Sequence, residues 1–283
     1  MHIDIFTIKF IGMIDFPCAK INIGLRITAR REDGYHNIQT IFYPVRLCDV
    51  LEFVIMPPGS DDDRLTVTGM DAGNPCENLV LKVLSTLRRI YKIPYLDIHL
   101  HKVIPPGAGL GGGSSDAAFF LKMINRHFGL GLNNEDLRNL ALSAGSDAPF
   151  FIENLPAYAE GRGECLTSLP PLSAGYHLVI LYSGISISTR EAYMKCTPVM
   201  REPLLPVYYR EDIIRWRELI INDFENIVFE SYPVLWELKE KLYESGALYS
   251  SMSGSGSAVY GIFSEKPELP PSLARHIIYS GPF

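Results

Sequence analysis

The feature that most constrains this chain is a glycine-rich run at residues 105–115, which we call the glycine loop. It follows Leu96–Val103, where apolar and polar residues alternate as in a strand. It precedes a segment to about His127 with apolar residues at helical spacing. The order strand, glycine loop, helix indicates an anion site, because glycines let backbone N–H groups converge and a helix N-terminus adds positive charge. The alternative, a flexible linker, rarely sits between a strand and a well-formed helix.

The helix after the loop has recognisable ends. Ser114 or Ser115 is the expected N-cap, and Gly129 is the expected C-terminal glycine. Its apolar face is predicted from residues at helical spacing: Ala117, Phe120, Leu121, Ile124 and Phe128.

Two common phosphate loops are excluded by the residues around the glycines. A Walker A loop requires a lysine directly after its last glycine, and none is present. A Rossmann loop follows the first strand of its unit and is followed by a strand ending in an acidic residue. Here about 100 residues precede the glycines, and residues 125–131 offer no such strand.

Strand and helix patterns alternate through the chain, which indicates a mixed α/β or α+β protein. An Asp33-Gly34 turn and a loop at Ser250–Ser257 are expected between elements. The alternation at Ile21–Ile27 predicts a half-buried strand. A stretch rich in Thr, Ser and Pro suggests two domains, residues 1–168 and 169–283. The remaining predicted elements are strands at Val50–Ile55, Leu65–Val67, His177–Tyr182 and Ala258–Phe263, and helices at Asn78–Tyr91, Glu135–Leu142, Ile213–Ile220 and Pro233–Ser245.

Composition limits the partners. The net charge of −6 gives no general attraction to nucleic acid or an anionic membrane, so neither is expected as a partner. The five cysteines are scattered with no disulfide pattern, which suggests a reducing, cytoplasmic setting. Met1–Phe16 is interrupted by charges and resembles neither a signal peptide nor a membrane span.

Three runs, in order along the chain, resemble the signatures of the GHMP kinases (galactokinase, homoserine, mevalonate and phosphomevalonate kinases). The first is residues 17–23, Pro-Cys-Ala-Lys-Ile-Asn-Ile; the second is the glycine loop with Asp-Ala-Ala after it; the third is residues 252–257, Met-Ser-Gly-Ser-Gly-Ser. Cys18 departs from the pattern, since a small residue such as alanine usually stands there, and the segment before Pro17 is longer than usual. The resemblance implies a two-domain α+β fold: an N-terminal domain like domain 2 of ribosomal protein S5, a ferredoxin-like C-terminal domain, and an active site in the cleft between them.

Further runs narrow the resemblance to one branch of the family. They are Arg30–His36, residues 145–151 (Gly-Ser-Asp-Ala-Pro-Phe-Phe) and residues 159–164 (Ala-Glu-Gly-Arg-Gly-Glu). That branch phosphorylates the 2-hydroxyl of a diphosphocytidyl-linked methylerythritol in the non-mevalonate isoprenoid pathway.

The resemblance implies roles for single residues. Asp147 would be the general base toward the alcohol, and Lys20 would stabilise charge on the reacting oxygens. ATP is the expected phosphate donor, with Mg²⁺ on ligands left open among Ser114, Ser115 and Asp116. The implied ATP-binding residues are Pro105, Pro106, Gly107, Ala108, Gly109, Leu110, Gly111, Gly112, Gly113, Ser114 and Ser115.

Substrate recognition is implied for five residues. Tyr35 and Tyr193 would sandwich the cytosine ring and His36 would bond its polar edge. Asn22 would also take part in substrate recognition, and Thr189 would bond the diphosphate or the sugar part of the substrate. For Tyr193 the ordinary alternative is a plain amphipathic contact. The rival functions are another GHMP kinase of mevalonate or homoserine type, and a catalytically silent nucleotide-binding regulator. The oligomeric state is left open between a monomer and a weak dimer.

Overall fold

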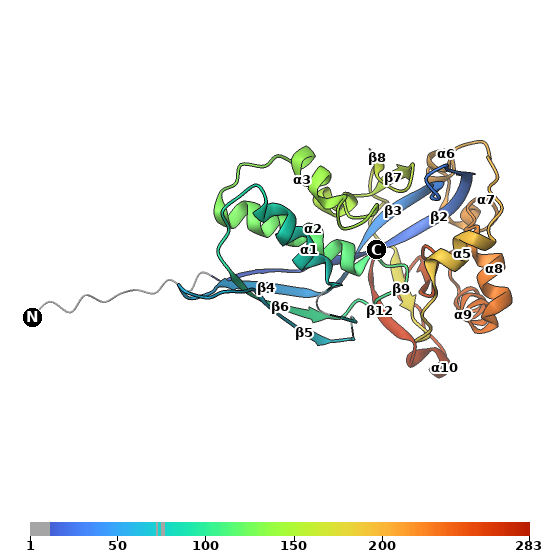
Figure 1. Cartoon of the computed structure of the whole chain (residues 1–283). Coiled ribbons are helices and arrows are strands. Elements are labelled where there is room, and N and C mark those ends of the chain that lie inside the picture. Colours follow the sequence, from blue (N-terminus) through green and yellow to red (C-terminus); the bar gives the residue numbers. More distant parts are fainter. Residues whose placement is uncertain (1–11, 72, 75–76) are drawn as a thin grey trace, which may run out of the picture.

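The structure is a computed structural model that describes residues 12–71, 73–74 and 77–283. Two four-stranded sheets lie in the first part of the chain and a third lies in the second part (Figure 1). In spatial order, the strands of the first sheet are β1 (Met13–Asp15), β4 (Val50–Ile55), β6 (Leu96–Lys102) and β5 (Arg64–Gly69). Those of the second sheet are β2 (Cys18–Arg30), β3 (His36–Cys48), β7 (Ala157–Glu160) and β8 (Cys165–Ser168). Those of the third sheet are β10 (Tyr249–Met252), β11 (Val259–Phe263), β9 (His177–Leu181) and β12 (Ile277–Pro282). Neighbouring strands are antiparallel except β5 and β6, which are parallel.

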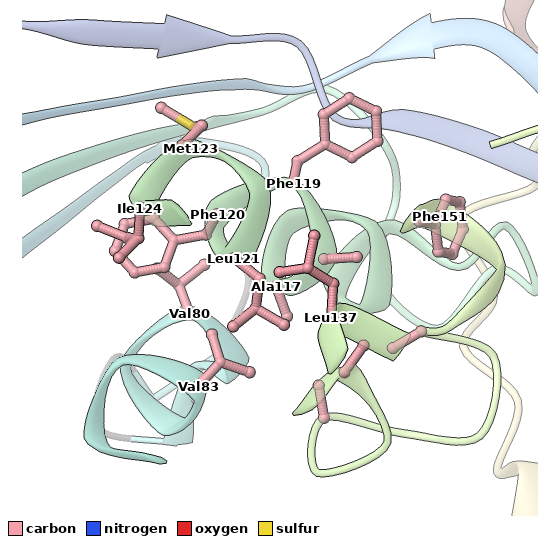
Figure 2. Packing of buried hydrophobic residues seen from close by; sticks show 14 of the residues in the cluster. Val80, Val83, Ala117, Phe119, Phe120, Leu121, Met123, Ile124, Leu137 and Phe151 are labelled. Carbon is pink, nitrogen blue, oxygen red and sulfur yellow. The ribbon is translucent and has the colours of Figure 1, made fainter. Parts of the chain in front are cut away.

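Helices cover the first sheet and build the core of the N-terminal part. Apolar side chains of α2 pack against Val80 and Val83 of α1 and Leu137 of α3 (Figure 2). The helices of this part are α1 (Leu79–Arg88), α2 (Gly112–Phe128), α3 (Asn134–Ala141) and α4 (Phe150–Glu153). This packing fixes the axis of α2, and therefore the place where its N-terminus meets the glycine loop.

The C-terminal part packs its helices around the third sheet (Figure 1). The longest, α9, begins at Pro233 and ends at Glu244, close to the predicted helix. The others are α5 (Thr189–Lys195), α6 (Leu205–Tyr209), the 3₁₀ helix η2 (Ile213–Arg215), α7 (Trp216–Leu219), α8 (Phe224–Ser231) and α10 (Pro271–Ala274). The helix predicted over residues 213–220 is therefore split into η2 and α7.

Strand β2 joins the two parts of the chain. The sequence predicted a half-buried strand, but residues 19–27 are buried on both faces, so that prediction is wrong. Ala19, Ile21 and Ile23 pack into a core shared with the third sheet. The opposite face carries Lys20 and Asn22, which are buried as well.

Two other local predictions are corrected. Helix α2 begins at Gly112 with Gly111 as its N-cap, not at a capping serine. The loop expected over residues 250–257 begins later, because β10 extends to Met252 and pairs with β11. Ser250 and Ser251 are buried within β10, and only their polarity had suggested a loop. Gly129 ends α2 in a left-handed conformation, as predicted.

Cys18 and Cys48 form a disulfide in this structure, so the prediction of unpaired cysteines is wrong for these two. They lie far apart in sequence, but pairing β2 with β3 places them opposite each other with Cα atoms 4.0 Å apart. Cys165 and Cys196 are free, and Cys76 lies outside the described residues.

Most of the N-terminal segment considered in the sequence, Met1–Phe16, lies outside the described residues, which begin at Gly12; β1 falls within the remainder. Over the described ranges, no helix has both the length and the apolar character needed to cross a membrane.

Candidate active site

A cavity of about 1040 Å³, which we call the cleft, lies between the two parts of the chain. Its walls come from segments far apart in sequence: β2, the turn before β3, the turn before α4, helix α5 and the loop after β10. The residues predicted to act in catalysis or substrate binding all line this cleft: Lys20, Asn22, Tyr35, His36, Asp147, Thr189 and Tyr193. The fold therefore brings all seven of these residues to one cavity.

Lys20 and Asp147 face each other at the base of the cleft. Lys20 Nζ lies 3.4 Å from Asp147 Oδ2, and the lysine side chain is 3% exposed while the aspartate side chain is 33% exposed. Burial lowers the pKa of the Lys20 ammonium, and the Asp147 carboxylate opposes this shift. The ammonium also donates to Gly109 O at 3.0 Å. The Lys20 ammonium thus contacts both the partly exposed carboxylate of Asp147 and the backbone of the glycine loop.

Asn22 holds Lys20 in place. Its Oδ1 accepts from Lys20 Nζ at 2.5 Å, and its Nδ2 donates to Thr40 Oγ1 at 2.9 Å. Its backbone N–H donates to Ser253 Oγ at 3.2 Å, and Ser253 Oγ donates to Gly109 O at 2.8 Å. The first and third sequence motifs are therefore hydrogen-bonded to each other and to the glycine loop.

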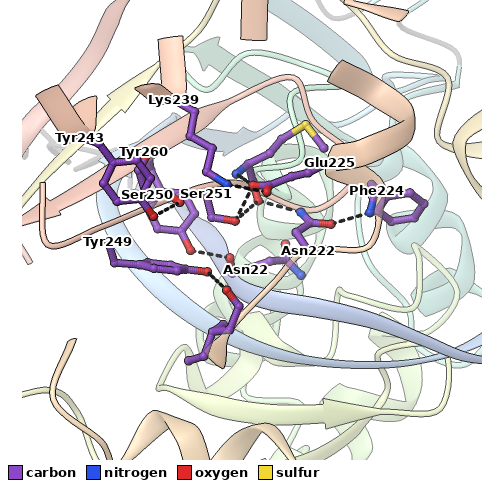
Figure 3. Close-up of polar contacts among 12 residues, drawn as sticks. Asn22, Asn222, Phe224, Glu225, Lys239, Tyr243, Tyr249, Ser250, Ser251 and Tyr260 are labelled. Atoms are coloured by element: carbon purple, nitrogen blue, oxygen red, sulfur yellow. Dashed lines mark hydrogen bonds and ion pairs between the residues drawn. The ribbon is translucent and has the colours of Figure 1, made fainter. Parts of the chain in front are cut away.

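A buried polar network supports the third motif from behind (Figure 3). Asn222 Nδ2 donates to Met252 O and Gly254 O, both at 2.8 Å. Glu225 Oε1 accepts from the backbone of Met252 at 2.8 Å, while its Oε2 pairs with Lys239 Nζ at 2.6 Å. These supporting residues were missed in the sequence, because an isolated Asn or Glu carries no local signal of burial.

Glycines shape the loop that borders the cleft. Gly107, Gly109 and Gly111 have φ of 67°, 77° and 72°, a region that favours glycine. A Cβ on Gly109 would lie 1.9 Å from the carbonyl oxygen of Ser253, so a side chain cannot fit there. The loop also lines a second cavity of about 360 Å³, together with Asn78, Leu79 and Lys102. This second cavity meets the first at Gly109 and Gly111.

The two serines after the loop lie in different places. Ser114 lines the second cavity, whereas Ser115 is buried and donates to Cys18 O at 2.7 Å. Asp116 also lines the second cavity, and its Oδ2 pairs with Lys102 Nζ at 2.7 Å. Its Oδ1 is buried and has no hydrogen-bond partner among the residues that the structure describes. Burial raises the pKa of Asp116 to about 8, against the opposing charge of Lys102.

Lys102 is held between two carboxylates, since it also pairs with Asp49. Asp49 Oδ1 accepts from the backbone N–H groups of Val103 at 2.6 Å and Ile104 at 2.8 Å. This buried cluster ties the end of β6 to the first turn of α2 and so sets both ends of the glycine loop.

Several aromatic side chains also line the cleft. His36 stacks on Tyr193, with ring centroids 5.1 Å apart and an interplanar angle of 19°. Tyr193 in turn packs edge-on against Phe224. Tyr35 is 55% exposed and does not stack on these rings; the guanidinium of Arg162 lies over it. Burial lowers the pKa of the His36 imidazole, with Arg30 adding to the shift, which favours a neutral ring.

Thr189 begins α5 beside the third motif. Ser188 caps this helix by accepting from the backbone of Glu191. The Thr189 and Ser255 hydroxyls are 2.9 Å apart, so the start of α5 is tied to the loop after β10.

Comparisons with known proteins show the family of the chain. The GHMP kinases N terminal domain model matches residues 78–154, and the GHMP kinases C terminal model matches residues 204–275. The chain is 46% identical over 259 residues to the 4-diphosphocytidyl-2-C-methyl-D-erythritol kinase of Bacteroides thetaiotaomicron, covering 91% of this chain and 94% of the relative. It is 47% identical over 262 residues to the enzyme of the same name from Porphyromonas gingivalis, with 91% and 94% covered.

Solved structures show the same relationship. A crystal structure of 4-(cytidine 5'-diphospho)-2C-methyl-D-erythritol kinase superposes with a TM-score of 0.74 at 30% identity, covering 95% of this chain and 98% of the other. A homoserine kinase from Cytophaga hutchinsonii superposes with a TM-score of 0.66 at 16% identity, covering 94% and 89%. The second likeness shows the shared fold alone.

Proposed function

The chain belongs to the 4-diphosphocytidyl-2-C-methyl-D-erythritol kinases of the GHMP kinase family, and from this premise we propose that Lys20 and Asp147 carry out its reaction. The enzyme transfers a phosphoryl group from ATP to the 2-hydroxyl of 4-diphosphocytidyl-2-C-methyl-D-erythritol. The observation that carries the proposal is the Lys20–Asp147 pair, 3.4 Å apart, which contacts the glycine loop at Gly109 and lines the same cleft as Tyr35, His36 and Tyr193.

In this proposal Asp147 receives the proton of the substrate hydroxyl. Its side chain is one-third exposed, so one carboxylate oxygen can reach a hydroxyl while Oδ2 stays beside Lys20. Lys20 is too deeply buried to act as a freely moving cation, and its contacts to Asn22 and Gly109 fix its ammonium. A fixed positive charge at this point stabilises the negative charge that develops on the transferred group.

The glycine loop is proposed to hold the ATP phosphates with its backbone N–H groups and the N-terminus of α2. The neighbouring cavity, lined by Asn78 and Leu79 as well as the loop, extends away from the cleft and is a suitable place for the rest of the nucleotide. ATP would then enter from the side of the second cavity and direct its terminal phosphate toward Lys20.

Mg²⁺ is part of the proposal, since it would neutralise phosphate charge. In the described part of the chain, no group of three or more His, Cys, Asp or Glu side chains is arranged to bind a metal. The residues fit an ion held mainly by phosphates and water, because Asp116 Oδ1 lacks a partner and Ser114 lines the same cavity. Asp116 and Ser114 are therefore the residues that would hold it.

We propose that the cytidyl group binds among the aromatic side chains that line the cleft. Tyr193 offers a buried ring face at present covered by His36, and Tyr35 offers an exposed ring. A base entering between the two tyrosines would displace the His36–Tyr193 stack and leave the neutral imidazole beside its polar edge. Asn22 would act through Lys20, because both ends of its side chain are already hydrogen-bonded and its Oδ1 holds the Lys20 ammonium.

A cytoplasmic site of action belongs to the same proposal, because the enzyme consumes ATP. Thiols are kept reduced in that compartment. The Cys18–Cys48 disulfide of the structure would be reduced there to two facing thiols.

The test is turnover of alternative substrates. Purified enzyme receives Mg-ATP with diphosphocytidyl-methylerythritol, mevalonate or homoserine, and ADP release is measured. We expect turnover with the cytidyl substrate alone. Turnover of mevalonate or homoserine in its place would contradict the proposal.

A further inference from the structure

The motif at residues 159–164 forms a turn that lies next to two residues of the proposed substrate site, Asp147 and Tyr35. We call residues 161–164, between β7 and β8, the β7–β8 turn. Its Gly163 is buried with φ of 119°, and a Cβ there would lie 3.0 Å from Asp147 Oδ1. The neighbouring Arg162 lines the cleft, with its guanidinium carbon 5.0 Å from the centre of the Tyr35 ring. Consecutive residues therefore contact the proposed base and the proposed cytosine partner.

The turn holds Arg162 in a defined position. Glu164 Oε2 accepts from the backbone N–H of Arg162 at 2.6 Å, and Glu164 Oε1 lies 3.5 Å from the guanidinium. Gly161 O accepts from the backbone of Ile38 at 2.7 Å, which anchors the turn to β3. The Arg162 side chain is 32% exposed, so it is neither free in solvent nor closed off from the cleft.

The position of Arg162 matches one part of the substrate. The cytosine end belongs at Tyr35 and the reacting hydroxyl belongs at Asp147, so the diphosphate between them must pass the residue that adjoins both. A guanidinium is suited to phosphate oxygens because it is planar, always charged and can donate two parallel hydrogen bonds. We propose that Arg162 is a substrate-binding residue that recognises the diphosphate joining the cytidine to the polyol. This inference rests on the proposed function and adds a specificity residue to it.

Other cations of the cleft are less suited to this role. Lys20 is committed to Asp147, Asn22 and Gly109. Arg30 and Arg190 also line the cleft, but both are exposed. Arg162 is half-buried, fixed by its turn and stacked on the ring that marks the base site.

The test separates a diphosphate contact from simple support of Tyr35. Cytidine and CDP are titrated calorimetrically into wild type and Arg162→Gln, with the ATP site filled by a non-hydrolysable ATP analogue. Loss of a charged hydrogen bond should weaken CDP binding by about tenfold or more. Cytidine, which has no phosphate, should change by less than about twofold. Arg162→Lys keeps the positive charge and should bind CDP more tightly than the Gln variant.

Arg64→Gln is the matched control, since Arg64 is also paired with a carboxylate, Asp97, but lies on β5 outside the cleft. It should leave both titrations unchanged, and an equal loss of CDP there would refute the assignment. Equal losses for cytidine and CDP in Arg162→Gln, no loss for CDP, or a Lys variant as weak as the Gln variant would each overturn it as well. If wild type turns over the cytidyl substrate, such results reject only the role of Arg162. If wild type does not, the proposed function itself fails.

Discussion

Replacing Gly109 with alanine should damage both the stability and the activity of this enzyme. Gly109 has φ of 77°, and its Cα faces the Ser253 carbonyl so closely that a Cβ would lie 1.9 Å from that oxygen. Its own carbonyl oxygen accepts hydrogen bonds from Lys20 and Ser253. A side chain here must push the glycine loop away from both partners.

The magnitude follows from two costs. Left-handed backbone costs alanine about 1–2 kcal/mol, and overpacking adds about 1–3 kcal/mol, so the free energy of unfolding should fall by about 2–5 kcal/mol. The matched control is Gly129→Ala: its φ is 59°, but no atom lies within 4 Å of its Cβ position. The free energy of unfolding of that variant should fall only by the backbone cost, about 1–2 kcal/mol.

Urea unfolding and steady-state kinetics check both variants. Because a misplacement of about 1 Å can cost roughly 100-fold in rate, kcat/KM of Gly109→Ala should fall by about that factor. Gly129→Ala, at the far end of α2, should keep wild-type kinetics. If Gly109→Ala matched Gly129→Ala in stability and kept kcat/KM near wild type, the close contact between the loop and the third motif would be wrong.

Three further predictions concern charge and stacking. Burial lowers the pKa of Lys20, so its ammonium is lost more easily than that of a free lysine as the pH rises. The pH–rate profile should therefore fall on the alkaline side below pH 10.5, the ordinary value for lysine, and a profile flat to that pH would contradict the role of Lys20. Tyr193→Leu should raise KM for the cytidyl substrate about tenfold with KM for ATP unchanged, since stacking contributes about 1–3 kcal/mol per base; equal changes in both KM values would argue against a base site there. Lys102→Met leaves two buried carboxylates without their cation and should lower the free energy of unfolding by about 3–5 kcal/mol, measured in urea; a loss below about 1 kcal/mol would show that the cluster is not structural.

The sequence predicted the parts of this enzyme whose signals are local. The alternation at Leu96–Val103 became β6, Gly129 ended α2, and the helix expected at Asn78–Tyr91 is α1, with Asn78 as its N-cap. The motif resemblance led to the residues that line the cleft, because each motif is a short continuous run.

The parts that were missed depend on contacts between distant segments. Burial of β2 on both faces requires the third sheet, which begins about 150 residues later. The pairing of Cys18 with Cys48 requires the register of β2 and β3. The N-cap of α2 is Gly111 rather than a serine, since the Ser115 hydroxyl donates its hydrogen bond to the backbone oxygen of Cys18 instead. None of these contacts leaves a pattern within a short window of sequence.

The most direct test of the central claim is Asp147→Asn, which keeps the size of the side chain and removes its capacity to accept a proton. General base catalysis contributes about 10²–10⁴-fold, so kcat should fall within that range. The affinities for ATP and for CDP, measured by calorimetry, should stay near wild type, because the proposed binding residues are untouched. A variant that kept near-normal kcat would contradict the assignment of Asp147 as the base.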